Sequence, residues 1–194
     1  MPYNPDKHRR RSLRLPHYDY ASPGAYFITI CTYQRQCLFG EIRDGVMKLN
    51  KFGEVARDCW QAIPDHFAHV QLDAFVVMPN HIHGIIVITD NTRRGTAMPC
   101  PYPTPQKRQF GESIPGSLPT IIGAYKSAVT KRINAARKVR GISIWQRNYY
   151  EHIIRNDIAL DRIRRYVQNN PASWQADQLH PDLPSQWCPP ATQP

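Results

Sequence analysis

The alternation of apolar and polar residues predicts three strands in the first half of the chain. The run "GAYFITICTY", which begins at Gly24, is rich in aromatic and β-branched residues and is typical of a strand. Two further runs, "VQLDAFVVM" and "HIHGIIVI", are separated only by Pro79 and Asn80, which are residues typical of a tight turn. We therefore expect the second and third strands to form a hairpin.

Apolar residues at helical spacing predict three helices. The first follows Asn50, a candidate N-cap, and Pro64 marks its end. The second begins after Ser117 with an apolar stripe, and Gly141 ends it. The third, "IALDRIRRYVQNN", is stopped by Pro171. Between the second and third helices, "SIWQRNYYEHIIR" is typical of another strand.

The predicted order of elements is β-α-β-β-α-β-α. Its first six elements match the ferredoxin-like split β-α-β arrangement, an α+β fold with an antiparallel sheet. In that topology the first and third strands lie side by side at the centre of the sheet. We therefore expect the strand "HIHGIIVI" to be central.

The 194 residues suit one domain with extensions. We expect a basic arm at residues 1–20, a domain at 21–171 and a C-terminal tail at 172–194. Within the domain, about 89–116 form a proline-rich insertion without periodicity, which is typical of a mobile functional loop or of disorder.

The charge distribution points to a polyanionic partner. The chain carries a formal net charge of +10. One cluster lies in the arm and comprises Lys7, Arg9, Arg10, Arg11 and Arg14. A second lies between Glu112 and Glu151, where no acidic residue occurs, and it includes Lys126, Lys131, Arg132 and Arg147. Such clustering favours nucleic acid over the alternative of a solvated basic helix face.

Several other classes of protein are disfavoured. No stretch approaches the roughly 18 apolar residues that a membrane span needs, and the basic N-terminus lacks the apolar segment of a secretory signal. The five cysteines include no C-x-x-C pair, so a disulfide framework and a cysteine zinc site are both disfavoured. We expect a cytoplasmic protein that associates with the nucleoid and not with a membrane.

Two histidines in the third predicted strand are candidate metal ligands. His81 and His83 project from the same face of that strand, because side chains alternate along it. Two imidazoles that converge from one face can share a metal ion. The alternative is a pair of buried histidines bonded to their neighbours, and the short His-x-His motif alone does not decide between these interpretations.

The last predicted helix adds two polar residues that could reach this pair. Leu160, Ile163 and Val167 form an apolar stripe that would dock on the sheet. Tyr166 and Asn170 are four residues apart, and hence neighbours at the margin of that stripe. If the helix packs across the sheet, the phenol and the amide can approach the imidazoles.

That set of groups suits one definite chemistry. Two imidazoles and an amide oxygen suit Mg²⁺ or Mn²⁺, and a tyrosine hydroxyl could attack a phosphate diester and form a covalent phosphotyrosine. Alternatively, Tyr166 is an ordinary tyrosine of an amphipathic helix and Asn170 a helix-terminal residue. Asn170 precedes Pro171, which disfavours helical backbone and could alter its reach. Tyr149 and Tyr150 are rival nucleophiles, although packing on a strand explains them better.

Two segments resemble a known family. "FVVMPNHIHGIIVI" resembles the His-hydrophobic-His signature of the one-tyrosine transposases among the HUH single-strand endonucleases. "SIWQRNYYEHIIRN…YVQNNP" resembles the REP-associated tyrosine transposases, in which a tryptophan-bearing strand precedes a helix ending in Tyr-x-x-x-Asn-Pro. The resemblance covers roughly residues 20–171.

The resemblance implies roles for the candidate residues. His81 and His83 would be metal ligands, Asn170 a third ligand and Tyr166 the nucleophile. The activity would be cleavage of single-stranded DNA near hairpins such as repetitive extragenic palindromes, leaving a 5′-phosphotyrosine and a free 3′-OH. The REP-associated branch looks monomeric, whereas the broader family often shares its sites across a homodimer.

Two other functions compete with this one. A DNA- or RNA-hairpin-binding module of the same fold would need the basic clusters but not the complete set of histidines, tyrosine and asparagine. A zinc hydrolase is disfavoured because neither an HExxH motif nor a further histidine cluster is present.

Overall fold

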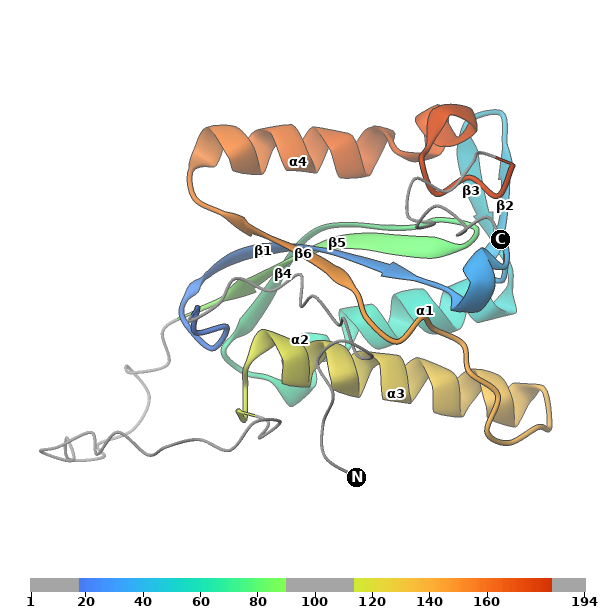
Figure 1. The fold of residues 1–194 in the computed structure, drawn as a ribbon, viewed down its shortest axis with the longest axis horizontal. Coiled ribbons are helices and arrows are strands. Elements are labelled where there is room, and N and C mark those ends of the chain that lie inside the picture. Colours follow the sequence, from blue (N-terminus) through green and yellow to red (C-terminus); the bar gives the residue numbers. More distant parts are fainter. Residues whose placement is uncertain (1–17, 90–113, 183–194) are drawn as a thin grey trace, which may run out of the picture.

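The computed structural model describes residues 18–89 and 114–182, and its centre is a four-stranded antiparallel sheet. The strand order is β4-β5-β1-β6. The strands are β1 (Gly24–Cys31), β4 (Val70–Val77), β5 (His81–Ile88) and β6 (Tyr150–Ile154). This is the predicted ferredoxin-like α+β fold, and β5 lies between β1 and β4 as expected (Figure 1).

Helices cover both faces of the sheet. The helices are α1 (Lys51–Gln61), α2 (Ile63–His66), α3 (Leu118–Ala136) and α4 (Asp157–Asn169). Figure 1 shows α1 and α3 on one face and α4 alone on the other. Two short 3-10 helices lie near the C-terminal end of α4, and they are η1 (Tyr33–Arg35) and η2 (Pro171–Ala176).

A small hairpin was not predicted. It consists of β2 (Gly40–Arg43) and β3 (Val46–Leu49), which pair only with each other. Asp44 and Gly45 between them both have positive φ (52° and 71°), as a type I′ turn requires. The Asp-Gly dipeptide is itself a hairpin signal, although four-residue strands show too little alternation to reinforce it. The hairpin lies beside η2 (Figure 1).

Three predicted boundaries differ from the structure. Helix α1 ends at Gln61, and Pro64 lies in the first turn of α2, where its missing N–H costs nothing. Helix α3 ends at Ala136, because Lys138 already adopts a left-handed backbone (φ 56°) before Gly141 is reached. The strand expected over 143–155 is confined to Tyr150–Ile154. Before it, Trp145 makes only an isolated bridge to Thr32, and the Lys126 ammonium binds the carbonyls of Gln146 and Arg147.

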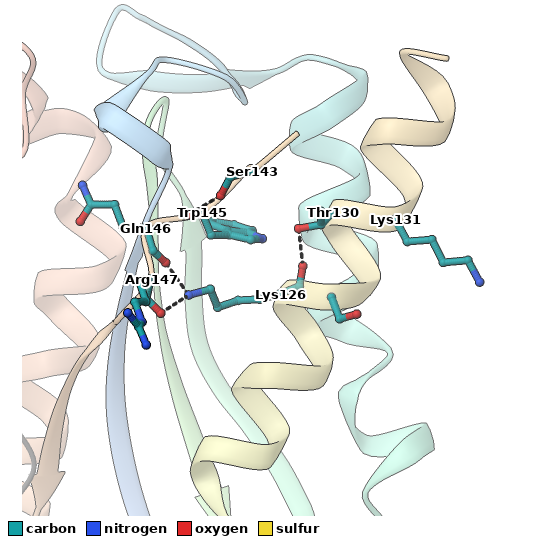
Figure 2. A pocket seen from close by; sticks show the side chains of 8 residues that line it. Lys126, Thr130, Lys131, Ser143, Trp145, Gln146 and Arg147 are labelled. Carbon is teal, nitrogen blue, oxygen red and sulfur yellow. Dashed lines mark hydrogen bonds between the residues drawn. The ribbon is translucent and has the colours of Figure 1, made fainter. Parts of the chain in front are cut away.

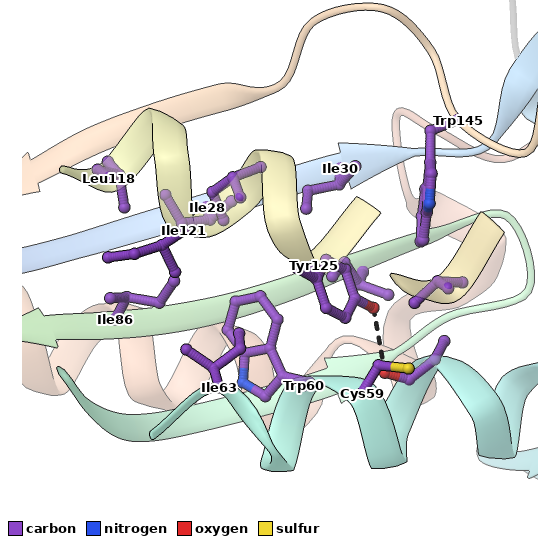
Figure 3. Close-up of a cluster of buried hydrophobic side chains, with 14 of the residues drawn as sticks. Ile28, Ile30, Cys59, Trp60, Ile63, Ile86, Leu118, Ile121, Tyr125 and Trp145 are labelled. Atoms are coloured by element: carbon purple, nitrogen blue, oxygen red, sulfur yellow. Dashed lines mark hydrogen bonds between the residues drawn. The ribbon is translucent and has the colours of Figure 1, made fainter. Parts of the chain in front are cut away.

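The main hydrophobic core lies between the sheet and the helices α1 and α3 (Figure 3). Trp60 of α1 stacks on Phe75 with ring centroids 4.7 Å apart, and Tyr125 of α3 packs edge-on against the same indole. Gly84 makes this packing possible. A Cβ at Gly84 would lie 2.3 Å from Cζ2 of Trp60, so only glycine lets the indole rest on β5.

The opposite face carries a smaller apolar cluster under α4. Val167 packs with Phe27, Ile85 and Ile154, and the predicted stripe of α4 therefore docks on the sheet as expected. The Arg164 guanidinium also donates hydrogen bonds from Nε and Nη2 to the Asp73 carboxylate of β4, with Nη2 2.7 Å from Oδ2. This packing brings the C-terminal half of α4 over the start of β5.

Candidate metal and nucleophile site

His81 and His83 lie on the α4 face of β5 and point toward each other. Their Nε2 atoms are 3.1 Å apart, and both residues are buried, with exposed fractions of 0% and 2%. At metal–ligand bond lengths of about 2.1 Å, neighbouring ligands of an octahedral ion lie about 3.0 Å apart. The spacing of the two nitrogens therefore matches that of adjacent ligands on one ion.

The outer nitrogens of both rings are held by hydrogen bonds. Asn80 uses its amide N–H groups on the backbone carbonyls of Arg35 and Leu179, at 3.2 and 2.7 Å. Its Oδ1, 2.8 Å from Nδ1 of His81, must therefore accept, which places the His81 proton on Nδ1. Nε2 of His81 then presents a lone pair to the site. Nδ1 of His83 bonds the Thr29 hydroxyl at 2.8 Å.

Both imidazoles are neutral at physiological pH. Burial lowers the pKa of His81 to about 3, against a smaller opposing effect of the nearby Asn170 amide. Burial, followed by the neighbouring His81, holds the pKa of His83 well below its usual range. Neutral imidazoles are the form that binds metal ions, so these two side chains are ready to act as ligands without losing a proton.

Tyr166 reaches the histidine pair from α4. Its hydroxyl lies 3.2 Å from Nε2 of His83, and its ring packs edge-on against Phe27. The side chain is half exposed, so a substrate can approach it. Burial and the Asp177 carboxylate raise the pKa of Tyr166 to about 12, so the phenol is neutral at physiological pH.

Asn170 is buried beside the same pair. Its backbone stays in the right-handed helical region (φ −57°, ψ −41°) although Pro171 follows, so the side chain keeps the reach of an i+4 partner of Tyr166. Its Nδ2 donates to Oδ2 of Asp177 at 3.0 Å. Among the described residues, its Oδ1 is buried without a hydrogen-bond partner. A buried, unpartnered amide oxygen is a natural ligand for a hard divalent cation.

Asp177 belongs to this site although sequence reasoning missed it. It follows η2 and is buried, and its Oδ2 lies 3.9 Å from Nε2 of His81. One ligand atom from each of His81, His83 and Asp177 lies within 4.8 Å of the other two. Trp174, buried near the His81 ring, anchors the segment. A tryptophan in the expected tail was the signal that this part of the tail packs on the domain.

An open hollow of about 690 Å³ exposes the site. Its lining includes His83, Tyr166, Asn170 and Asp177, together with Arg35 and Gln146. We call it the active-site hollow. The rival tyrosines, Tyr149 and Tyr150, also line it.

A second hollow of about 430 Å³ lies between α3 and residues 143–147 (Figure 2). We call it the basic hollow, because Lys126, Lys131 and Arg147 line it. The Lys126 ammonium donates to the carbonyls of Gln146 and Arg147 at 2.6 and 3.1 Å, and burial lowers its pKa to about 8. Gln146 lines both hollows, which are therefore adjacent.

The remaining predicted DNA contacts fall into two groups. Arg132 is exposed on α3 beside Lys131. The residues of the basic arm lie outside the described residues, and they are Lys7, Arg9, Arg10, Arg11 and Arg14. The described helices include none that is both long enough and apolar enough to span a membrane.

Two proteins of Haemophilus influenzae are similar in sequence to this chain. No family model matches the chain. An uncharacterized protein of Haemophilus influenzae is 45% identical over 181 residues, which cover 93% of this chain and 98% of that protein. The Haemophilus influenzae protein named "Putative REP-associated tyrosine transposase" is 25% identical over 175 residues, 85% of each chain.

One solved structure has a similar fold. It is a REP-associated tyrosine transposase bound to a REP hairpin, and it superposes with a TM-score of 0.53 over 94% of each chain, at 16% identity. At this low identity the likeness concerns the fold, which agrees with the strand order described above.

Proposed function

We propose that this chain is a REP-associated tyrosine transposase, and that it acts as a metal-dependent endonuclease and strand transferase for single-stranded DNA. Its similarity to a protein of that name and to a solved transposase of similar fold supports the proposal. One observation carries the proposal. The Tyr166 hydroxyl lies 3.2 Å from a histidine whose Nε2 is itself 3.1 Å from that of a second, neutral histidine. A nucleophile beside a pair of metal ligands is what phosphotyrosine chemistry needs and a binding module does not.

The proposed metal site uses groups from three segments. His81 and His83 supply nitrogens from β5, Asn170 supplies its unpartnered Oδ1, and Asp177 is an additional ligand that sequence reasoning missed. Mg²⁺ or Mn²⁺ suits this mixture of nitrogen and oxygen donors. When bound, the ion polarises the phosphate and offsets the negative charge that develops on it.

In the proposed step the Tyr166 oxygen attacks the phosphorus of a DNA diester. A bond forms between that oxygen and phosphorus, and the bond between phosphorus and the 3′ oxygen breaks. The phenol releases one proton and the leaving 3′ oxygen takes one up. The products are a 5′-phosphotyrosine and a free 3′-OH. Because the diester energy is kept in the phosphotyrosine, another 3′-OH can reverse the step and join a different strand.

The proposed substrate is a DNA hairpin with an adjacent single strand, such as a repetitive extragenic palindrome. The basic hollow and the exposed Lys131, Arg132 and Arg147 offer positive charge to the phosphates of a hairpin stem. The neighbouring active-site hollow would take the single strand, with Gln146 at the junction. The solved transposase of similar fold binds a REP hairpin, which supports this choice.

We propose that one chain acts alone on DNA of the nucleoid, in the cytoplasm. His81, His83, Tyr166, Asn170 and Asp177 all come from the same chain, so the site needs no residue from a partner.

A denaturing gel tests the proposal. The protein is incubated with Mg²⁺ or Mn²⁺ and labelled single-stranded oligonucleotides that carry hairpins. We expect a protein-linked DNA band that disappears with EDTA, with Tyr166→Phe and with His81→Ala, while Tyr150→Phe retains it as the matched control. Tight hairpin binding without a covalent band, for every oligonucleotide tried, would contradict the proposal and favour a hairpin-binding module.

A further inference from the structure

Arg35 is the one lysine or arginine among the described residues that line the active-site hollow. It lies in η1, directly after β1, and shares the hollow with Tyr166, His83 and Asp177. The basic residues of α3 cannot replace it there, because α3 covers the opposite face of the sheet (Figure 1).

The backbone around Arg35 is held in an unusual conformation. Gln34 and Arg35 both have left-handed φ values, 53° and 55°, which non-glycine residues adopt only at a cost. Hydrogen bonds hold this turn in place. The Arg35 N–H donates to the carbonyl of Thr32 at 3.1 Å, and the Thr32 hydroxyl contacts the backbone carbonyl of Asn80 at 2.9 Å.

The same turn is connected to the metal ligands. The Arg35 carbonyl accepts a hydrogen bond from Nδ2 of Asn80, and Oδ1 of Asn80 holds Nδ1 of His81. Asn80 thus positions both the η1 turn and one imidazole. The η1 turn and the His81 imidazole therefore keep a fixed relative position. Such a fixed position is needed if the guanidinium and the metal contact the same phosphate.

The charges of the site leave a role for a second cation. The Asp177 carboxylate is the acidic side chain of this set, and the Asn170 amide carries no charge. A divalent ion held beside Asp177 retains one net positive charge, whereas a phosphate diester gains negative charge as the tyrosine oxygen attacks it.

We propose that the Arg35 guanidinium binds a non-bridging oxygen of the scissile phosphate and stabilises the charge that develops there when Tyr166 attacks. This rests on the proposed function. Arginine presents several N–H donors in a planar fork that fits phosphate oxygens, and it keeps its proton throughout. The contact is stronger in the transition state than in the ground state, so Arg35 acts mainly on the rate of covalent attachment and less on affinity.

The test compares Arg35→Ala with Arg43→Ala, which removes an arginine that pairs with Glu41 on the exposed hairpin. Single-turnover rates of covalent attachment are measured on two intact oligonucleotides. One is a hairpin substrate that the wild type cleaves, and the other has a neutral methylphosphonate in place of its scissile phosphate. We expect Arg35→Ala to slow attachment to the normal strand by about 10²–10³-fold, and Arg43→Ala to have little effect. On the methylphosphonate, the wild type and Arg35→Ala should react at similar rates.

A binding measurement gives a second readout that does not depend on reaction. This measurement uses Tyr166→Phe, which cannot form the covalent product. Replacing the scissile phosphate by methylphosphonate should weaken binding of the oligonucleotide about tenfold when Arg35 is present, and hardly at all when Arg35→Ala is added. Affinity for Mn²⁺ alone should not fall in Arg35→Ala, because Arg35 is not a ligand.

Two results would overturn the assignment. Equal slowing of both oligonucleotides by Arg35→Ala, with the same loss of binding to each, would mean that Arg35 acts through the fold or through Asp177. Equal rates for Arg35→Ala and Arg43→Ala on the normal strand would mean that it has no part in the step. Absence of any covalent product with the wild type is a different failure, because it removes the proposed function and the role of Arg35 together.

Discussion

The two faces of the sheet use neighbouring residues of β5 for different purposes. Ile82, Gly84 and Ile86 face α1 and α3 and contribute to a dry apolar core. His81 and His83 alternate with them, face α4, and end in buried nitrogens. Because successive side chains of a strand point to opposite faces, one eight-residue strand can serve both the core and the site.

The difference shows where stability comes from. Burial of apolar side chains on the α1 and α3 face stabilises the fold. On the α4 face, buried nitrogen and oxygen atoms oppose folding unless they are fully hydrogen-bonded. Asn170 keeps an oxygen that has no partner in the described part of the chain. The first face can therefore hold the molecule together while the second keeps unsatisfied groups for a ligand.

The largest expected difference is between adjacent residues of β5. We expect Ile82→Ala to lower the free energy of unfolding by about 2–5 kcal/mol, because it opens a cavity in the main core. It should nevertheless retain Mn²⁺ affinity, whereas His81→Ala should lose it. Urea unfolding and Mn²⁺ titration of both variants measure the contrast. Loss of Mn²⁺ affinity in both would show that the two faces are not independent.

Metal binding on the α4 face should stabilise the folded protein. With Mn²⁺ at 100 times its dissociation constant, the free energy of unfolding should rise by about 2.7 kcal/mol, and EDTA should reverse the gain. Asp177→Asn should reduce the gain, because the carboxylate becomes a weaker ligand. Thermal unfolding of the wild type and of Asp177→Asn, with and without Mn²⁺, measures the gain in each protein. An undiminished gain in Asp177→Asn would remove Asp177 from the ligand set.

Acid should weaken the fold through the two histidines. Their pKa values are lowered in the folded state, to about 3 for His81, while the unfolded chain takes up protons below about pH 6.5. Above pH 6.5 the imidazoles are neutral in both the folded and the unfolded chain, so they add no pH dependence there. As pH drops from 6.5 toward 3, only the unfolded chain takes up protons, and the free energy of unfolding falls. The slope is about 1.4 kcal/mol per pH unit for each histidine. Urea unfolding of wild type and His81→Ala at pH 7 and 5.5, without metal, should give a shallower slope for the variant, and identical slopes would refute this origin.

The smallest effect on stability concerns the ion pair that ties α4 to β4. Asp73→Asn should cost no more than about 1 kcal/mol, since the pair with Arg164 is partly exposed. Asp73→Asn should also slow covalent attachment, because Arg164 precedes Tyr166 by two residues and fixes the helix over the site. Glu41→Gln, which breaks an exposed pair elsewhere, is the control. If both substitutions change the attachment rate equally, the ion pair has no positioning role.

The elements that could be predicted are those with a local pattern. The alternation in "HIHGIIVI" placed the two histidines on one face, and the stripe of Leu160, Ile163 and Val167 predicted that α4 docks on the sheet. Other parts depend on contacts between distant residues. Nothing local in the sequence indicates that Asn80 bonds Leu179, or that Asp177 returns to His81.

Boundaries failed where side chains compete with backbone pairing. In the predicted strand over 143–155, Trp145 makes only an isolated bridge to Thr32, and the Lys126 ammonium takes the carbonyls of Gln146 and Arg147. The position of Arg35 beside the site depends on a left-handed turn that has no glycine to signal it. Such features arise from tertiary packing, and a single sequence does not carry them in its periodicity.

The most direct test of the central claim is to identify the residue that becomes linked to DNA. After reaction with a hairpin oligonucleotide and nuclease digestion, trypsin separates the candidates. Cleavage after Arg165 releases a fragment from Tyr166 to Pro194 that contains one tyrosine, whereas Tyr149 and Tyr150 lie together in the fragment that follows Arg147. We expect mass spectrometry to find the nucleotide on Tyr166. A nucleotide on Tyr149 or Tyr150, or on no tyrosine, would contradict the assignment of Tyr166 as the nucleophile.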